Sequence, residues 1–186
     1  MKELIDEAKR TAAKLNFATS GNGSVPHLAT MVFSGLNGAE MVHVPYKSGG
    51  LAVASVAAGD THLTFATSPS VMPQVQAGRL RGIAVTTKAR SPLVTGLPGM
   101  EESGVTGYDV SIWYGFFVPA ATPRPLVTRW FEATTQALKD PKFREIMAKD
   151  GTETPGSKSP EEFTAFIREE ARQTAKAIRD SGAKFD

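Results

Sequence analysis

Cysteine is absent from this 186-residue sequence, and its absence excludes two kinds of structure. A disulfide framework and a thiolate metal site both require cysteine side chains. Long apolar runs are missing too, since no segment approaches the roughly 18–20 apolar residues of a membrane-spanning helix. The first ten residues are charged and amphipathic and contain no apolar core. We therefore expect no export signal in this sequence.

An excess of one charge sign is also missing. The sequence carries 21 basic and 19 acidic residues, which give a formal net charge of +2, and the basic residues do not cluster. Because nucleic-acid binding usually requires a concentrated basic patch, we predict no nucleic-acid partner. Hydrophobic residues make up 41% and charged residues 22%, which is ordinary for a globular protein of one domain, or one domain plus part of another.

Strand and helix patterns alternate over the first half of the chain. After an amphipathic helix at residues 2–13, strands are predicted at residues 15–19, 41–44, 62–66 and 80–86. The segments between them predict helices from Ser24 to about Gly35, at residues 51–58 and at residues 71–77. Such alternation is typical of an α/β protein with a mixed, mostly parallel sheet flanked by helices.

The pattern changes in the second half. Residues 88–107 are rich in glycine and proline and predict loops, and the apolar, aromatic residues 108–118 predict a long strand. Three amphipathic helices are then predicted from Thr122, from Asp140 and from Ser159, the last ending near Gly182. Their apolar faces require something to pack against.

The turn at residues 20–24 (SGNGS) joins a predicted strand to a predicted helix. Free N–H groups at a helix start and the helix dipole together favour a bound anion. Glycines at such a turn let a ligand oxygen approach the backbone closely. Pro26 excludes the dinucleotide fingerprint, which needs a glycine there. The phosphate-binding P-loop is excluded because Gly23, Ser24 and Val25 stand where it needs Gly-Lys-Ser/Thr. A tight turn without any ligand explains the same residues equally well.

Two further loops follow strand ends and precede helices. One contains Tyr46 and Lys47 and the other contains Thr67 and Ser68. In an open α/β sheet, ligands bind at the carboxyl ends of the strands, so we expect the three loops to form one anion-binding rim. Lys47 by itself also fits an ordinary solvated lysine. The candidate ligand-binding residues are Ser20, Gly21, Asn22, Gly23, Ser24, His27, Tyr46, Lys47, Thr67 and Ser68.

The sequence offers no convincing catalytic set. His27, His43 and His62 lack the spacing of metal ligands, so no metal site is predicted. Ser24 and His27 are three residues apart, but the Gly-x-Ser-x-Gly elbow of a hydrolase is absent. We interpret His27 as a hydrogen-bonding support behind the glycine turn. The prediction is a protein that is not an enzyme and that has no catalytic residues and no cofactor.

Five motifs resemble a known family, in order and over essentially the whole chain. They are residues 20–27 (SGNGSVPH), 43–47 (HVPYK), 77–86 (AGRLRGIAVT), 113–120 (WYGFFVPA) and 159–163 (SPEEF). The sequence resembles the substrate-binding proteins of tripartite tricarboxylate transporters, also called the Bug family. The resemblance implies a two-lobed periplasmic protein of the type II binding-protein class. Such a protein captures a small carboxylate with backbone amides and ordered waters and delivers it to membrane subunits of the transporter.

The resemblance also implies a domain organisation. Residues 1–13 are expected to be a residual helix of lobe one or a hinge, and residues 14–108 a complete α/β second lobe. Residues 109–186 are expected to be a crossover strand and C-terminal helices of lobe one. The N-terminal part of lobe one, with its signal peptide, is expected to be missing from this sequence, whose localisation would be periplasmic by resemblance only.

Such a truncation would uncover apolar helix faces, at Trp130 and Phe131 and at Phe143 and Met147. Large exposed apolar patches drive association, so we expect a homodimer or a domain-swapped assembly. Two alternatives to a solute-binding fragment remain at this point. One is a stand-alone anion-binding or phosphate-ester-acting α/β protein, and the other is a structural remnant without a ligand.

Overall fold

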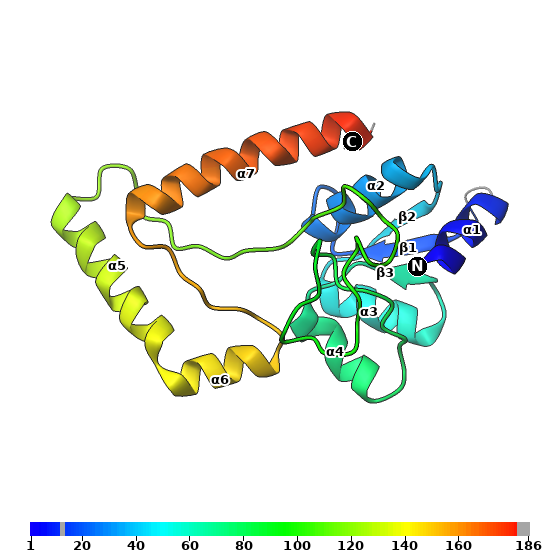
Figure 1. Ribbon diagram of the computed structural model, residues 1–186, viewed down its shortest axis with the longest axis horizontal. Coiled ribbons are helices and arrows are strands. Elements are labelled where there is room, and N and C mark those ends of the chain that lie inside the picture. Colours follow the sequence, from blue (N-terminus) through cyan, green and yellow to red (C-terminus); the bar gives the residue numbers. More distant parts are fainter. Residues whose placement is uncertain (12–13, 182–186) are drawn as a thin grey trace. The chain divides into compact units, whose positions relative to one another are not determined.

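The computed structural model describes residues 1–11 and 14–181, and its ribbon is drawn in Figure 1. The chain divides into two compact units. Unit 1 consists of Met1–Ile112 together with the end of the chain from Lys176, and unit 2 consists of Trp113–Ala175. The predicted continuation of the first helix to residue 13 and the predicted helix end near Gly182 lie outside the described residues.

Unit 1 is built around a small parallel sheet of three strands in the order β2-β1-β3. The central strand β1 (Asn16–Thr19) pairs with β2 (Val42–Pro45) on one side and with β3 (Leu63–Thr64) on the other. Parallel neighbours require crossover connections, and the chain supplies them as helices. The predicted α/β class is therefore confirmed, and every strand of the described chain is parallel to its neighbour.

Four helices accompany this sheet. Figure 1 shows α2 on one side of the sheet and α3 and α4 on the other. The helices are α1 (Lys2–Thr11), α2 (Val25–Asn37), α3 (Gly49–Ala58) and α4 (Ser68–Gln76). All three predicted helices after the strands are confirmed, although α3 and α4 begin two or three residues earlier than the apolar pattern suggested.

Capping residues set the ends of these helices. The Ser24 hydroxyl accepts a hydrogen bond from the His27 N–H at the start of α2, and the Ser48 hydroxyl accepts one from the Leu51 N–H at the start of α3. Each cap satisfies a backbone donor that has no partner inside its helix. Gly59 ends α3 in the left-handed conformation that favours glycine, with φ of 85°.

The core of unit 1 lies where α1 and α2 meet the sheet and the loops that follow. Phe17, Phe33 and Tyr108 are completely buried there, and the rings of Phe33, Phe65 and Tyr108 contact one another. Burial of one such side chain contributes about 1.5–3 kcal/mol. The Tyr108 hydroxyl donates to the Ala29 carbonyl at 2.9 Å, so this buried polar group is satisfied.

The predicted strands at residues 80–86 and 108–118 are wrong, because the chain is irregular at both places. These segments make single backbone hydrogen bonds instead of a continuous β-ladder. The Val85 N–H donates to the Pro98 carbonyl, and the Val110 N–H donates to the Thr86 carbonyl. β-propensity reflects a side chain's fit to a paired sheet rather than an intrinsic backbone preference. Without a continuous neighbouring strand, the apolar residues pack from extended but unpaired segments.

Unit 2 consists of an extended segment and helices. The helices are α5 (Arg124–Lys139), α6 (Pro141–Lys149) and α7 (Pro160–Ser181), the last of which runs beyond the unit. The predicted starts of α6 and α7 are confirmed by their caps. The Asp140 carboxylate accepts from the Phe143 N–H at 2.8 Å, and the Ser159 hydroxyl accepts from the Glu162 N–H at 3.1 Å.

Aromatic side chains hold the extended segment to α7 within unit 2. Trp113 packs edge to face on Phe163 and Phe166, with ring centroids 5.7 and 5.3 Å apart. The Trp113 ring N–H also donates to the Glu170 carboxylate at 3.1 Å. None of the described helices in either unit is both long and apolar enough to cross a membrane.

Candidate functional site

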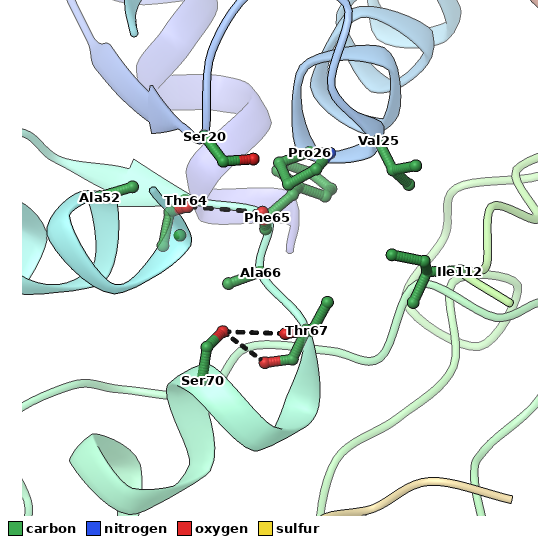
Figure 2. A pocket seen from close by; sticks show the side chains of 11 residues that line it. Ser20, Val25, Pro26, Ala52, Thr64, Phe65, Ala66, Thr67, Ser70 and Ile112 are labelled. Carbon is green, nitrogen blue, oxygen red and sulfur yellow. Dashed lines mark hydrogen bonds between the residues drawn. The ribbon is translucent and has the colours of Figure 1, made fainter. Parts of the chain in front are cut away.

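A pocket of about 280 Å³ lies in unit 1 at the carboxyl ends of the strands (Figure 2). Its walls come from the end of β1, the first turns of α2, α3 and α4, and the connection that follows β3. The lining residues are Ser20, Val25, Pro26, Gly49, Ala52, Thr64, Phe65, Ala66, Thr67, Ser70 and Ile112. None of these side chains is ionisable, so the pocket offers small apolar groups, hydroxyl groups and backbone.

Three helix starts meet at this pocket. Each of these helices is at least nine residues long and directs the positive end of its dipole toward its first turn. Within the described chain, no acceptor takes the backbone N–H of Val25, Gly49 or Ser68, which are the first residues of the three helices. Unpaired amides and aligned dipoles at one place favour an anion.

The glycine turn between β1 and α2 is folded back on itself. The Ser24 hydroxyl donates to the Gly21 carbonyl at 2.7 Å, and the Ser24 N–H donates to the same oxygen at 3.3 Å. Gly21 and Gly23 have φ of 115° and 71°, a region that side chains with a Cβ rarely adopt. The two glycines therefore allow the chain to turn sharply between the strand and the helix.

Two stacked histidine rings lie beneath this turn. The centroids of His27 and His43 are 3.9 Å apart with planes inclined by 11°, and Phe17 stacks on His43 at 4.9 Å. Burial lowers the pKa of His27 below its ordinary value. Burial, and secondly the neighbouring His27, lower the pKa of His43 to about 4. Both rings are therefore neutral near pH 7.

Hydroxyl groups form the opposite side of the pocket (Figure 2). The Ser70 hydroxyl donates to the Thr67 carbonyl at 2.8 Å, and the Thr67 and Ser70 hydroxyl oxygens are 3.1 Å apart. The Thr67 side chain makes no capping bond to α4. It is half-buried at the pocket wall.

The structure brings only part of the predicted site together. Ser20 and Thr67 line the pocket, whereas residues 21–24 form the adjoining turn and Ser68 begins α4. The predicted site residues away from the lining are Gly21, Asn22, Gly23, Ser24, His27, Tyr46, Lys47 and Ser68.

Two of these side chains are directed elsewhere, and one supports the turn. The Tyr46 hydroxyl donates to the Ser55 hydroxyl at 2.7 Å, and Lys47 is exposed. His27 is buried and accepts a bond from the Gly23 N–H at 3.1 Å, as expected for a support behind the turn.

Sequence reasoning missed nine of the lining residues. Gly49 and Ser70 had a recognisable signal, because each lies in the first turn of a helix that follows a strand. Ala52, Phe65 and Ile112 carry no polar side-chain group and are brought to the pocket by the fold alone.

In residues 1–11 and 14–181, no three histidine or acidic side chains gather as a possible metal site.

The chain matches the family described as "Tripartite tricarboxylate transporter family receptor" over residues 1–183. It therefore belongs to this family, whose members are solute-binding receptors. Among its relatives is the "UPF0065 protein in tcbD-tcbE intergenic region" of Pseudomonas sp. (strain P51), which is 30% identical over 177 residues. That match covers 95% of this chain and 52% of the relative.

Solved structures resemble the chain closely in fold. "R. palustris Rpa4515 with adipate" superposes with a TM-score of 0.92 at 30% identity, covering 98% of this chain and 60% of that one. "Periplasmic binding protein BugD" superposes with a TM-score of 0.90 at 30% identity, covering 99% and 62%. The fold is thus that of periplasmic binding proteins, and the chain spans a little over half the length of these relatives.

Proposed function

We propose that this chain carries part of the binding site of a periplasmic receptor that captures a small carboxylate for a tripartite tricarboxylate transporter. One observation carries the proposal: three helix starts with unpaired amides meet at one pocket that has no ionisable side chain. Such a pocket can hold a negative charge without a lysine or arginine, because backbone dipoles supply the positive potential.

The ligand class follows from the same chemistry. A carboxylate presents two oxygens that accept hydrogen bonds from N–H and hydroxyl donors. The N–H groups of Val25, Gly49 and Ser68 and the hydroxyls of Ser20 and Thr67 are the donors that we assign to it. The apolar wall formed by Phe65 and others suits a short hydrocarbon chain. One structural relative is R. palustris Rpa4515 with adipate, a six-carbon dicarboxylate.

The predicted site residues enter this proposal in two groups. Residues 20–24 and Thr67 and Ser68 provide amides and hydroxyls at or beside the pocket, and His27 supports the turn. Neither Tyr46 nor Lys47 lines the pocket, so their contribution to the anion-binding rim is only a proposal. Ordered waters bridge amides that lie too far from the ligand for a direct bond.

Lobe organisation and partners belong to the same proposal. Residues 14–108 fall within unit 1 and contain the whole described sheet, which supports their assignment as one lobe. Residues 1–13 and 109–186 would then belong to the hinge and to the other lobe. Membrane subunits of the transporter would receive the ligand, and the periplasm would be the compartment. Both are proposed from family membership.

Gly49 gives a direct test of recognition by backbone amides. Gly49 is the first residue of α3 and its φ is not positive, while Ser48 before it is extended. Proline is tolerated at this helix position and after an extended residue, so Gly49→Pro removes one N–H without breaking the helix. Gly49→Ala is the matched control, because it keeps the N–H and its Cβ would meet nothing within 4 Å.

The measurement is titration calorimetry of both variants and the parent with adipate, a tricarboxylate, inorganic phosphate and a diamine. We expect adipate to bind the parent and the diamine not to bind. Gly49→Pro should weaken adipate roughly 10- to 100-fold, the loss of one hydrogen bond to a charged group. Equal affinity for both Gly49 variants would reject backbone recognition, and the absence of any carboxylate binding by the parent would reject the function.

A further inference from the structure

The glycine turn contains a regular alternation of backbone donors. The Gly21 N–H donates to the Thr19 hydroxyl oxygen at 3.1 Å, and the Gly23 N–H donates to His27 Nδ1 at 3.1 Å. Within the described residues, no acceptor takes the N–H of Ser20, Asn22 or Val25. The N–H groups of Ser20 and Asn22 are therefore unpaired, whereas those of Gly21 and Gly23 are hydrogen-bonded to groups of the protein.

One inward bond ends on His27, and the other ends on the Thr19 hydroxyl, which in turn contacts His43. His27 accepts one of them directly, and the Thr19 oxygen that accepts the other lies 2.6 Å from His43 Nε2. The rings are parallel within 11° at 3.9 Å, so a shift of either ring would move its neighbour as well. Phe17, completely buried, closes the stack on the side of His43. The pair therefore supports the turn at two points, directly through His27 and by way of Thr19 through His43.

We propose that His27 and His43 are positioning residues of the binding site: as a stacked pair they hold the Gly23 amide directly and the Gly21 amide through Thr19, which leaves the alternate amides of the turn for the ligand. This inference rests on the proposed carboxylate-binding function and assigns a role to residues that do not line the pocket. Neither histidine contacts the ligand in this account.

The hydrogen bond from Gly23 sets the protonation state that the role requires. Nδ1 of His27 accepts that bond, so its proton must be on Nε2 and the ring must be neutral. A second proton would place an N–H donor against the Gly23 N–H and a positive charge against His43. Each ring stacks on the other histidine, and burial lowers the pKa of both.

Matched substitutions separate the hydrogen bond from the packing. His27→Asn keeps an acceptor, because the asparagine Oδ1 reaches about the same place as histidine Nδ1. His27→Phe keeps an aromatic ring in the stack but removes the acceptor. His43→Gln and His43→Phe form the equivalent pair for the contact with Thr19.

Adipate affinity is measured by calorimetry for the parent and all four variants, with circular dichroism to compare their folds. We expect both Phe variants to bind roughly five- to tenfold more weakly, the effect of one lost neutral hydrogen bond. His27→Asn and His43→Gln should remain within about twofold of the parent, since each keeps its bond. Phe variants that bind as the parent does, or Asn and Gln variants that lose as much as Phe, would overturn the proposal.

A measurement on the unchanged protein covers the case in which a variant fails to fold. Nitrogen-15 NMR of the imidazoles should show His27 protonated on Nε2 and not on Nδ1 at pH 7. Amide exchange should be slower at Gly21 and Gly23 than at Asn22, whose N–H is unpaired. Proton occupancy of His27 Nδ1, or the reverse order of exchange, would reject the positioning role.

The two proposals can fail separately. If the parent protein bound no carboxylate, the proposed function would fall, and the tautomer and exchange order would still decide whether the pair shapes the turn. If the parent bound adipate and the exchange order were reversed, the function would stand and the positioning role would not.

Discussion

The two units of this chain contain similar aromatic side chains but bury them very differently. In unit 1, Phe17, Phe33 and Tyr108 are completely excluded from solvent. All residues of unit 2 are described, and none of them is buried. Tyr114 and Phe116 are each 73% exposed. Composition alone therefore does not distinguish a core from an exposed surface.

The difference lies in what each apolar face meets. In unit 1 a sheet and the helices beside it enclose the apolar side chains between two layers, the usual condition for a domain core. In unit 2 an extended segment and amphipathic helices meet without a sheet. The pocket belongs to the unit that has the enclosed core, so its helix starts are held in place by that core.

Removal of a ring should produce the largest contrast between the units. Phe33→Ala deletes a completely buried ring, and we expect a loss of about 3–5 kcal/mol in the free energy of unfolding. Phe117→Ala removes a ring that is 67% exposed and should cost less than about 1 kcal/mol. Urea unfolding followed by amide exchange in β1 measures the first, and fluorescence of Trp113 and Trp130 measures the second.

A Phe117→Ala cost as large as that of Phe33→Ala would break the comparison, because it would mean that the aromatic face of unit 2 is buried in solution.

Self-association is the second expected effect. Trp130 is 58% exposed and stacks on exposed Phe116, so the homodimer inferred from the sequence stays a prediction with an accessible apolar surface. Trp130→Glu should shift the mass measured by light scattering toward the monomer. Gln136→Glu adds the same charge at another exposed position of α5 and should leave the mass unchanged. A parent chain that is monomeric at every concentration would contradict the prediction.

Each unit also has a helix-capping side chain, and removal of either cap should lower the free energy of unfolding by less than removal of a buried ring. Ser24 caps α2 in unit 1 and also donates to the Gly21 carbonyl, whereas Asp140 caps α6 in unit 2 with one bond. We expect Ser24→Ala to cost about 1–2 kcal/mol and Asp140→Ala about 1 kcal/mol or less, measured by urea unfolding. Ser24→Thr and Asp140→Asn keep a capping oxygen and serve as controls. Equal costs would show that the second bond of Ser24 adds no stability.

A pH dependence of stability is also expected in unit 1. The pKa of His43 is lowered from 6.5 to about 4 in the folded protein, so between these values the unfolded chain binds more protons. Stability should therefore be complete above pH 6.5 and decline as the pH falls toward 4. Amide exchange in β1 at pH 7 and pH 5 measures it, and His43→Phe should reduce the decline. An unchanged decline in His43→Phe would assign it to other groups.

Much of unit 1 could be predicted from local signals. Ser24 before Pro26 predicted the start of α2, Gly59 predicted the end of α3, and the apolar segments at β1, β2 and β3 were located correctly. These features depend on neighbouring residues, so a single sequence contains them. Residues 80–86 and 108–118 failed, because whether an apolar segment becomes a strand depends on a partner strand that local sequence does not reveal.

The site was predictable in its polar part only. The rule that ligands bind at the carboxyl ends of parallel strands pointed to Ser20 and Thr67, which both line the pocket. Lys47 was attractive for its charge, but its exposed side chain does not line the pocket. Ala52 and Ile112 line it without any chemical signal, since their place follows from packing between segments distant in the sequence.

The absence of charged side chains from the pocket wall has an evolutionary consequence. Donors that belong to the main chain are present whatever residue occupies the position, proline excepted, so ordinary point mutations cannot delete them. Wall residues such as Ala52, Phe65 and Ile112 can change in size while the amides of the helix starts stay in place. Under the proposed function, receptors built on this plan could diversify in the solutes they accept and still retain a preference for negative charge.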